Sequence, residues 1–213
     1  MNLYLRLLRV LFLSLFRKQV HPCGETVTHF RVWPHDIDAF GHMNNGRYLQ
    51  IMDVARVDWM RRTRVLDKIL GGGCTALLGG TVIRHCKPLG PFRRYSVHSS
   101  VLAWEERWAF LKHEFRTDKG DVSAVGYSRA AIRRRGGWIT PQSLVDQIVP
   151  SLSSPPIPVL VRRWLAVDDG LVGEASFGHL NPEDAGSVKA PADQTVPGLP
   201  PHELSVDRAG HRL

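Results

Sequence analysis

Residues 35–48 read HDIDAFGHMNNGRY, a polar stretch that stands directly before a long apolar periodicity. Asn44 and Asn45 are residues that cap helices well, so a helix is predicted to begin here and to run to about Arg64. Within it, apolar residues recur at helical spacing: Tyr48, Met52, Ala55 and Trp59, widened by Ile51, Val54 and Val57. Such a broad apolar stripe indicates a helix that other elements largely bury.

The loop before this helix contains the parts of a reactive site. Asp36 and Asp38 are two residues apart, so an extended backbone puts both on one side, and Gly41 allows a turn back toward the helix. The free amides at a helix start stabilise a carboxylate or a developing oxyanion. A carboxylate beside such amides fits acyl transfer. The alternative, that these residues only cap a turn and a helix, remains open at this point.

Strand-like segments surround the predicted helix. One alternating segment, GETVTHFRVW at 24–33, precedes it and ends at Pro34. Four more follow a triple-glycine loop at 71–73, with turns between them: 74–87, 93–105, 107–117 and 121–134. One strand, a long helix and four strands predict an α+β fold in which an antiparallel sheet wraps around the helix.

Composition narrows the class of partner. The 213 residues have ordinary hydrophobic and charged fractions, 43% and 23%, and a formal charge of +8, which attracts anionic partners such as coenzyme A or acidic lipids. The arginines fall in short clusters without a nucleic-acid motif, so no nucleic-acid binding is expected. Three cysteines, without a second ligand pair at zinc-like spacing, predict neither a disulfide framework nor a metal site, and no cofactor is expected.

The two ends of the chain differ from the middle. Residues 1–22 form an apolar amphipathic segment whose first nineteen residues are too short and too often interrupted by arginine to span a bilayer. Their pattern fits a helix on a membrane surface and equally a helix packed on its own domain. We expect a main domain at 23–150, a helical extension at 151–172 and a disordered tail at 173–213.

The string D-I-D-A-F-G-H-M-N-N-x-x-Y, with one strand before the helix and four after it, closely resembles the hot-dog-fold thioesterases of the 4-hydroxybenzoyl-CoA and acyl-carrier-protein thioesterase type. The resemblance covers roughly residues 24–135. It implies a hot-dog fold and the hydrolysis of an acyl-CoA or acyl-carrier-protein thioester to a free acid and a thiol. The end segments also look like features of a membrane-associated branch of this family.

The resemblance assigns roles to individual residues. Asp38 falls at the catalytic aspartate of one branch, and the backbone amide of Asn45 at the group that polarises the thioester carbonyl. His42 and Asn44 match a His-x-Asn pair that stands beside that carboxylate. A second branch uses a glutamate on the central helix, and Asp53 occupies that position as a reserve candidate. Several short-chain members carry His or Tyr at the Asn45 position, so their substrate preference does not transfer.

The substrate is expected to meet Gly41, Tyr48 and the strand-edge arginines Arg93, Arg94 and Arg133, which could bind CoA phosphates. The family usually places its site between subunits, which implies at least a homodimer. A non-catalytic acyl-CoA-binding or membrane-associated scaffold is the alternative. A dehydratase is less favoured, because no second His/Asp pairing accompanies the motif. The expected location is the cytoplasm, with a peripheral association at the inner face of a membrane as an open possibility.

Overall fold

A computed structural model of the chain describes residues 3–177. The chain divides into two compact units, 1–170 and 171–213, and the features below belong to the first. The helices are α1 (Leu3–Ser14), the single 3-10 turn η1 (Pro34–Asp36), α2 (Asn45–Arg62), α3 (Val65–Gly71), α4 (Pro141–Val145) and α5 (Val159–Phe177). The strands are β1 (Thr26–Arg31), β2 (Cys74–His85), β3 (Arg94–Trp104), β4 (Trp108–Thr117), β5 (Val122–Arg134) and β6 (Gly137–Ile139).

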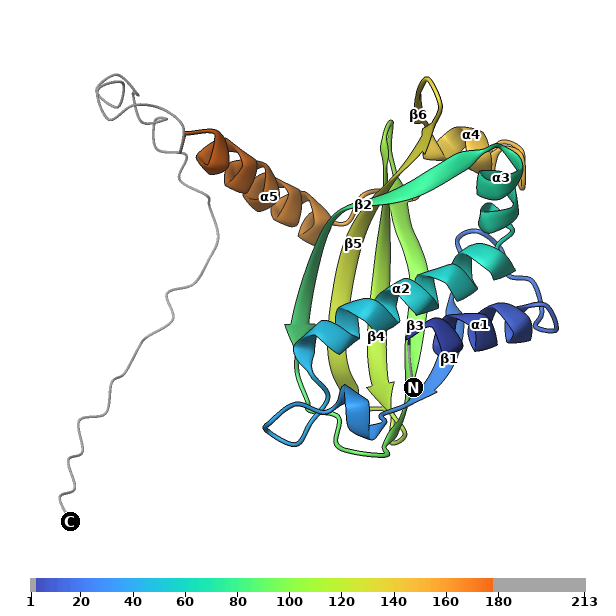
Figure 1. Cartoon of the computed structure of the whole chain (residues 1–213). Coiled ribbons are helices and arrows are strands. Elements are labelled where there is room, and N and C mark those ends of the chain that lie inside the picture. The colour runs from blue at the N-terminus through green and yellow to red at the C-terminus, as the bar shows by residue number, and fades with distance from the viewer. Residues whose placement is uncertain (1–2, 178–213) are drawn as a thin grey trace, which may run out of the picture. The chain divides into compact units, whose positions relative to one another are not determined.

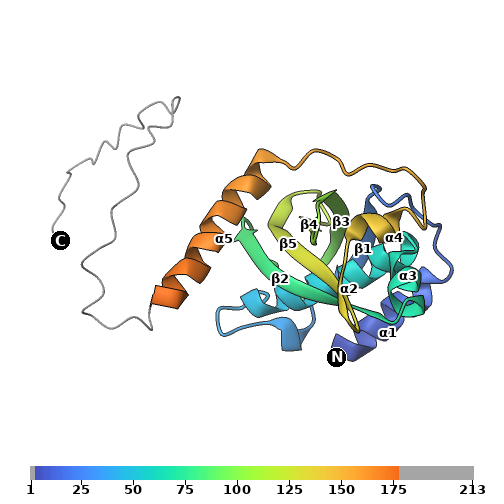
Figure 2. The same cartoon turned by 90° about the horizontal axis from the view of Figure 1, so that it is seen from above.

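One antiparallel sheet curls around α2, as Figures 1 and 2 show from two directions. Its strand order is β1-β3-β4-β5-β2, and the short β6 pairs with β5. The five main strands and the long helix therefore stand where their sequence patterns predict them. The predicted α+β fold with a sheet wrapped around the helix is confirmed.

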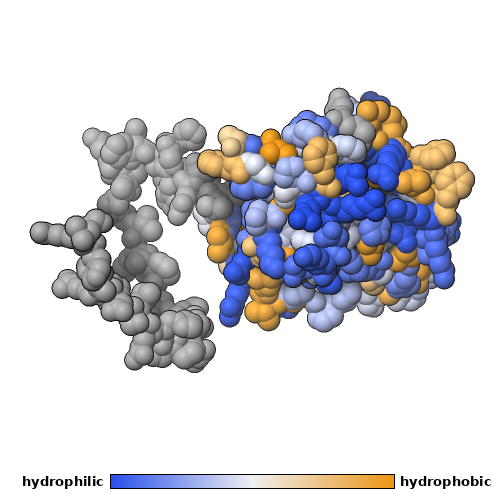
Figure 3. Space-filling model, turned by 90° about the horizontal axis from the view of Figure 1, so that it is seen from below, coloured by the Kyte–Doolittle hydropathy of each residue, from blue (hydrophilic) through white to orange (hydrophobic). Residues whose placement is uncertain are grey.

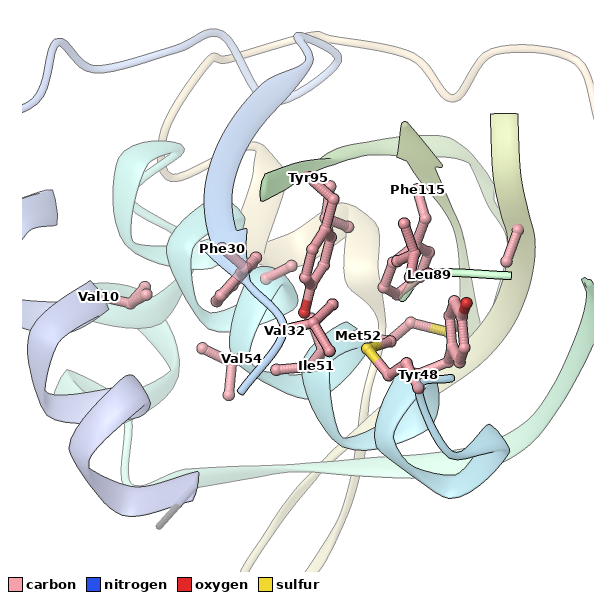
Figure 4. Close-up of a cluster of buried hydrophobic side chains, with 14 residues drawn as sticks. Val10, Phe30, Val32, Tyr48, Ile51, Met52, Val54, Leu89, Tyr95 and Phe115 are labelled. Atoms are coloured by element: carbon pink, nitrogen blue, oxygen red, sulfur yellow. The ribbon is translucent and has the colours of Figure 1, made fainter. Parts of the chain in front are cut away.

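The main core lies between α2 and the concave face of the sheet. Buried side chains from α2, including Ile51 and Met52, meet Tyr95 and Phe115 from the strands. The close-up shows these side chains converging from the helix and the sheet (Figure 4). Burial of this kind contributes about 1.5–3 kcal/mol for each large apolar side chain, so the stripe on α2 holds the helix in the sheet.

Helix α2 ends at Arg62, slightly before the end that the apolar pattern predicts at about Arg64, and local backbone geometry explains the difference. Thr63 donates its hydroxyl to the Trp59 carbonyl, 2.8 Å away, and Arg64 then takes a left-handed conformation at φ 67°. A helix cannot pass through that conformation. The chain therefore restarts as α3, a separate short helix that the sequence pattern did not predict, and α3 ends at the triple glycine.

Helix α1 packs on its own domain along one face. Arg6, Val10 and Ser14 are buried, and Val10 belongs to the main core. The opposite face is exposed and mostly apolar: it carries Tyr4, Leu5, Leu8 and Phe12, continued by Leu15 and Phe16 beyond the helix, and one charged residue, Arg9, is exposed there as well. Of the two alternatives, self-packing is observed, and it leaves a second apolar face open.

The first twelve residues of α5 belong to this unit and pack against part of the convex face of the sheet. Val161 is buried with Ala103 and Phe110, and Trp164 packs against the same cluster. Arg129 on β5 also pairs with Asp168 at 2.6 Å. The predicted extension at 151–172 is thus helical from Val159 and continues to Phe177, and residues 178–213 of the predicted tail lie outside the described residues.

Candidate active site

The loop between β1 and α2 is anchored by a buried carboxylate. The Asp36 side chain has no exposed surface, and it forms an ion pair with Arg6 of α1, which is 5% exposed. One Asp36 carboxylate oxygen also accepts a hydrogen bond from the Trp33 N–H at 2.9 Å. In addition, the Asp36 carbonyl accepts from the Asn44 N–H at 2.8 Å. Asp36 therefore joins α1, the start of the loop and the start of α2.

Asp38 sits at the base of a tight turn and is still 18% exposed. Its carboxylate accepts from the Phe40 N–H at 2.9 Å and lies 3.4 Å from His42 Nδ1. The backbone closes the turn, because the Asp38 N–H donates to the His42 carbonyl at 3.0 Å. Gly41 has φ +81°, which favours glycine. The structure thus brings Asp38, Gly41 and His42 together.

The start of α2 lies at the other end of this turn. Ile37 and Met43 form an antiparallel bridge, so the segment returns directly to the helix. Asn44 is the N-cap, and its side-chain oxygen accepts from the Gly46 N–H at 2.9 Å. Asn45 is the first helical residue, whose N–H belongs to the donors that an α-helix cannot pair internally. The loop lies at the lower end of the sheet in Figure 1, on the largely hydrophilic face of Figure 3.

Tyr48 lies in the core. It is 2% exposed, its hydroxyl is 3.2 Å from Ser123 Oγ, and its ring meets Phe115 edge-on at a centroid distance of 5.0 Å. Burial raises the pKa of the Tyr48 hydroxyl above its ordinary value. In this structure the Tyr48 side chain holds the first turn of α2 against the sheet, through packing and a buried hydrogen bond.

The candidate CoA-binding arginines divide between the two ends of the sheet. Arg93 and Arg94 are exposed, and the Arg93 carbonyl accepts from the Val32 N–H next to the loop, at 2.9 Å. Arg133 lies near the other end of β5, where its guanidinium faces the Trp138 ring at 5.8 Å. The structure therefore places two of the three arginines near the candidate loop.

A basic hollow of about 500 Å³ adjoins the loop. Arg9, Arg31 and Arg94 line it together with Trp33. Arg31 stands opposite Arg94 in the register of β1 and β3, and α1 adds Arg9. The sequence pattern missed Arg9 and Arg31 because only strand register and helix packing bring these charges together.

Asp53 stands beside a different hollow. It is 59% exposed, and its carboxylate pairs with Arg56 Nη1 at 2.6 Å. Both residues line a space of about 350 Å³ between α2 and β2. Asp38 and Asp53 therefore belong to separate surroundings, one at the start of α2 and the other two turns further along.

Two further properties concern the described part of the chain. Among residues 3–177, no three His, Cys, Asp or Glu side chains are grouped so that they could hold a metal ion, and Cys23, Cys74 and Cys86 are free thiols. No helix in this part combines the length and the apolar character needed to cross a bilayer.

Comparison with known proteins identifies a family for this chain. The model of the Thioesterase-like superfamily matches residues 32–165. Protein THEM6 of Xenopus laevis is 30% identical over 139 residues, which are 65% of this chain and 66% of that protein, so the match spans slightly under two thirds of the relative.

Solved structures agree in fold. A probable thioesterase, YbaW from Escherichia coli, superposes with a TM-score of 0.53 at 15% identity, over 58% of this chain and 96% of YbaW. The protein SAV2348 from Staphylococcus aureus, solved in complex with CoA, gives 0.53 at 14% identity, over 66% of this chain and 92% of SAV2348. The predicted hot-dog fold is confirmed.

Proposed function

Because the chain belongs to the Thioesterase-like superfamily, we propose that it hydrolyses acyl thioesters, with acyl-CoA or an acyl-carrier protein as substrate and a carboxylic acid and a thiol as products. The observation that carries the proposal is the turn that joins the Asp38 carboxylate to the N-terminus of α2. A carboxylate and unpaired helix amides are the two groups that acyl transfer to water needs. This activity would place the protein in lipid metabolism.

The proposed reaction has two forms. In the first, Asp38 removes a proton from water while the water oxygen attacks the thioester carbon, and the C–S bond then breaks to release the thiolate. In the second, the Asp38 carboxylate attacks the carbon itself, and water hydrolyses the resulting mixed anhydride. In both, the Asn45 N–H stabilises the negative charge on the carbonyl oxygen. One such donor supplies about 3–4 kcal/mol of transition-state stabilisation.

His42 and Asn44 would support these two groups. His42 Nδ1 is 3.4 Å from the Asp38 carboxylate, so its ring orients that carboxylate. Asn44 caps α2 and thereby fixes the direction of the neighbouring amide. Gly41 provides the turn. Arg93 and Arg94, with Arg9 and Arg31, provide positive charge for CoA phosphates on the same side.

The test compares carboxylate-to-amide variants on a panel of acyl-CoAs, with release of free thiol as the assay. Asp38→Asn should lower kcat by about 10²-fold or more, because the amide cannot accept a proton or act as a nucleophile. Asp53→Asn tests the reserve candidate, and Asp67→Asn, which changes an exposed partner of Arg61, is the matched control. Unchanged hydrolysis by Asp38→Asn, with a loss in Asp53→Asn, would transfer the catalytic role. Acyl-CoA binding without turnover by the wild type would favour the scaffold alternative.

We further propose that a second copy of the chain covers the edge of β2. This twelve-residue strand is the last in the sheet, and no strand in the described range pairs with its outer edge. Leu77, Leu78 and Val82 are exposed on it. A long apolar edge is a surface that proteins usually cover. Light scattering should give a dimer or a larger homo-oligomer, and Leu78→Lys should shift it toward monomer. A wild-type monomer at working concentration would reject this proposal.

The exposed face of α1 supports an association with membranes. Phe12 and Phe16 project from it together with four other apolar side chains, and the net charge of +8 favours anionic lipids. We propose a cytoplasmic protein that lies on the inner face of a membrane. Phe12→Asp with Phe16→Asp should reduce sedimentation with anionic vesicles, whereas Val159→Asp, an exposed change on α5, should not. Deleting α1 is a poor test, because Arg6 and Val10 are buried in the domain.

A further inference from the structure

The C-terminal half of α2 borders an apolar cavity that has no role in the proposed hydrolysis. The cavity has a volume of about 60 Å³ and lies between the C-terminal half of α2, the sheet, α3 and α4. Its wall is almost wholly apolar and includes Trp59, Met60, Ile69, Trp104, Ala109 and Ala130. An apolar space of this kind does not retain water, and it has room for roughly four groups of the size of a methylene.

A second space lies beside this cavity and shares Arg56 with it as a lining residue. The hollow of about 350 Å³ beside Asp53 is bounded by α2 on one side and by residues 78–81 of β2 on the other. The register of β2 shifts between Leu78 and Gly80. Within that irregularity, Gly79 lies so close to the Trp108 ring that an added Cβ would be 2.3 Å from a ring carbon. The wall of the outer hollow is thus fixed by a specific local structure in β2.

Arg56 lines both spaces and forms the boundary between them. Its guanidinium is tied to Asp53 Oδ1 at 2.6 Å and to Ser128 Oγ at 3.3 Å, while its Nε finds no hydrogen-bond partner among the described residues. Both tethers hold the charged end of Arg56, which leaves the methylene groups of its stem to meet an apolar chain. An apolar chain can lie along such a stem without meeting a full charge.

Residues of α2 that line the two spaces form a stripe on the same helix face as Asn45, whose amide belongs to the proposed reaction centre. Asn45, Leu49, Met52, Arg56 and Met60 follow one another at steps of three or four, so they share a helix face. From Asn45, the rise along the helix is about 16 Å to Arg56 and about 22 Å to Met60. A zigzag alkyl chain advances about 1.25 Å per carbon, so about thirteen carbons reach Arg56 and about eighteen reach Met60.

We infer that this stripe is the path of the acyl chain, and that the protein takes long-chain acyl thioesters whose far end occupies the cavity beyond Arg56. The inference rests on the proposed hydrolysis at Asp38 and Asn45, and it adds the substrate class. A chain of eight carbons ends in the outer hollow before Arg56. A chain of sixteen carbons passes Arg56 and places its last carbons in the cavity. Each methylene buried there improves binding about fourfold.

The experiment compares kcat/KM for octanoyl-CoA and hexadecanoyl-CoA, the latter below the concentration at which it forms micelles. The wild type should prefer the longer substrate by at least about tenfold. Ala109→Val and, separately, Ala130→Val add two methyl groups to the cavity wall. Each should lower kcat/KM for hexadecanoyl-CoA by about tenfold and leave octanoyl-CoA within about twofold. Retained octanoyl-CoA turnover also shows that the variants fold.

The matched control is Ala166→Val, which makes the same change at an exposed position of α5 and should leave both substrates unaffected. Equal losses on both substrates, or no loss on either, in the two cavity variants would overturn the inference. If the wild type hydrolyses neither substrate, the proposed function fails. Calorimetric binding of the same two acyl-CoAs then tests the path of the acyl chain independently of hydrolysis. Weaker binding of hexadecanoyl-CoA alone in the cavity variants would support the inference, and unchanged binding would reject it.

Discussion

The buried pair of Arg6 and Asp36 offers a quantitative test of how α1 and the candidate site depend on each other. Replacing Arg6 by Met keeps an unbranched, flexible side chain but shortens it and removes the charge. Asp36 is then left as a carboxylate without exposed surface, and breaking a buried pair in this way costs about 3–5 kcal/mol. The Trp33 N–H at 2.9 Å and Arg47 at 3.7 Å still compensate part of that charge. We therefore expect a loss of about 3 kcal/mol in the free energy of unfolding.

For a unit of this size, about 3 kcal/mol corresponds to a decrease in Tm of roughly 6–12 °C. Thermal unfolding followed by circular dichroism measures it, and urea titration supplies the free energy. The double variant Arg6→Met, Asp36→Asn removes both charges, so it should recover much of the loss. Thiol release should fall in the single variant as well, because Asp36 holds both ends of the loop. A decrease in Tm below about 2 °C, or strictly additive effects in the double variant, would show that the ion pair of Arg6 and Asp36 does not stabilise the fold in this way.

Three further predictions concern single residues. His113 is fully buried, and this burial lowers its pKa well below 6.5. Only the unfolded chain then takes up its proton, so the free energy of unfolding should fall as the pH drops below about 6.5, and His113→Gln should flatten that fall in urea titrations. Asn44→Ala removes the cap on Gly46 and should cost about 1 kcal/mol of stability; a change below about 0.3 kcal/mol would contradict a capping role. Gly79→Ala forces a methyl group against Trp108 and should cost about 1–3 kcal/mol in the same titrations, whereas an unchanged midpoint would show that the ring moves aside freely.

Local signals in the sequence were sufficient for the main elements and for the loop. The cap at Asn44, the apolar spacing through α2 and the alternation in the strands each act over a few residues, so they can be recognised without knowing the fold. The same is true of the turn from Asp38 through Gly41, because the amide of Phe40 and the carbonyl of His42 are near neighbours in the chain.

Contacts between residues far apart in the chain depend on how the elements pack. Arg6 lies on the arginine side of an apolar helix in sequence, yet it is buried against Asp36, thirty residues away. Likewise, Arg31 meets Arg94 only through strand register, and Arg56 joins two spaces only because β2 passes beside α2. Capping and periodicity depend on backbone geometry within one element, whereas burial and ion pairs depend on which elements pack together. The long helix, the five main strands and the loop with the candidate reactive groups could therefore be predicted from the sequence, whereas packing set which charges are buried and where a substrate chain can lie.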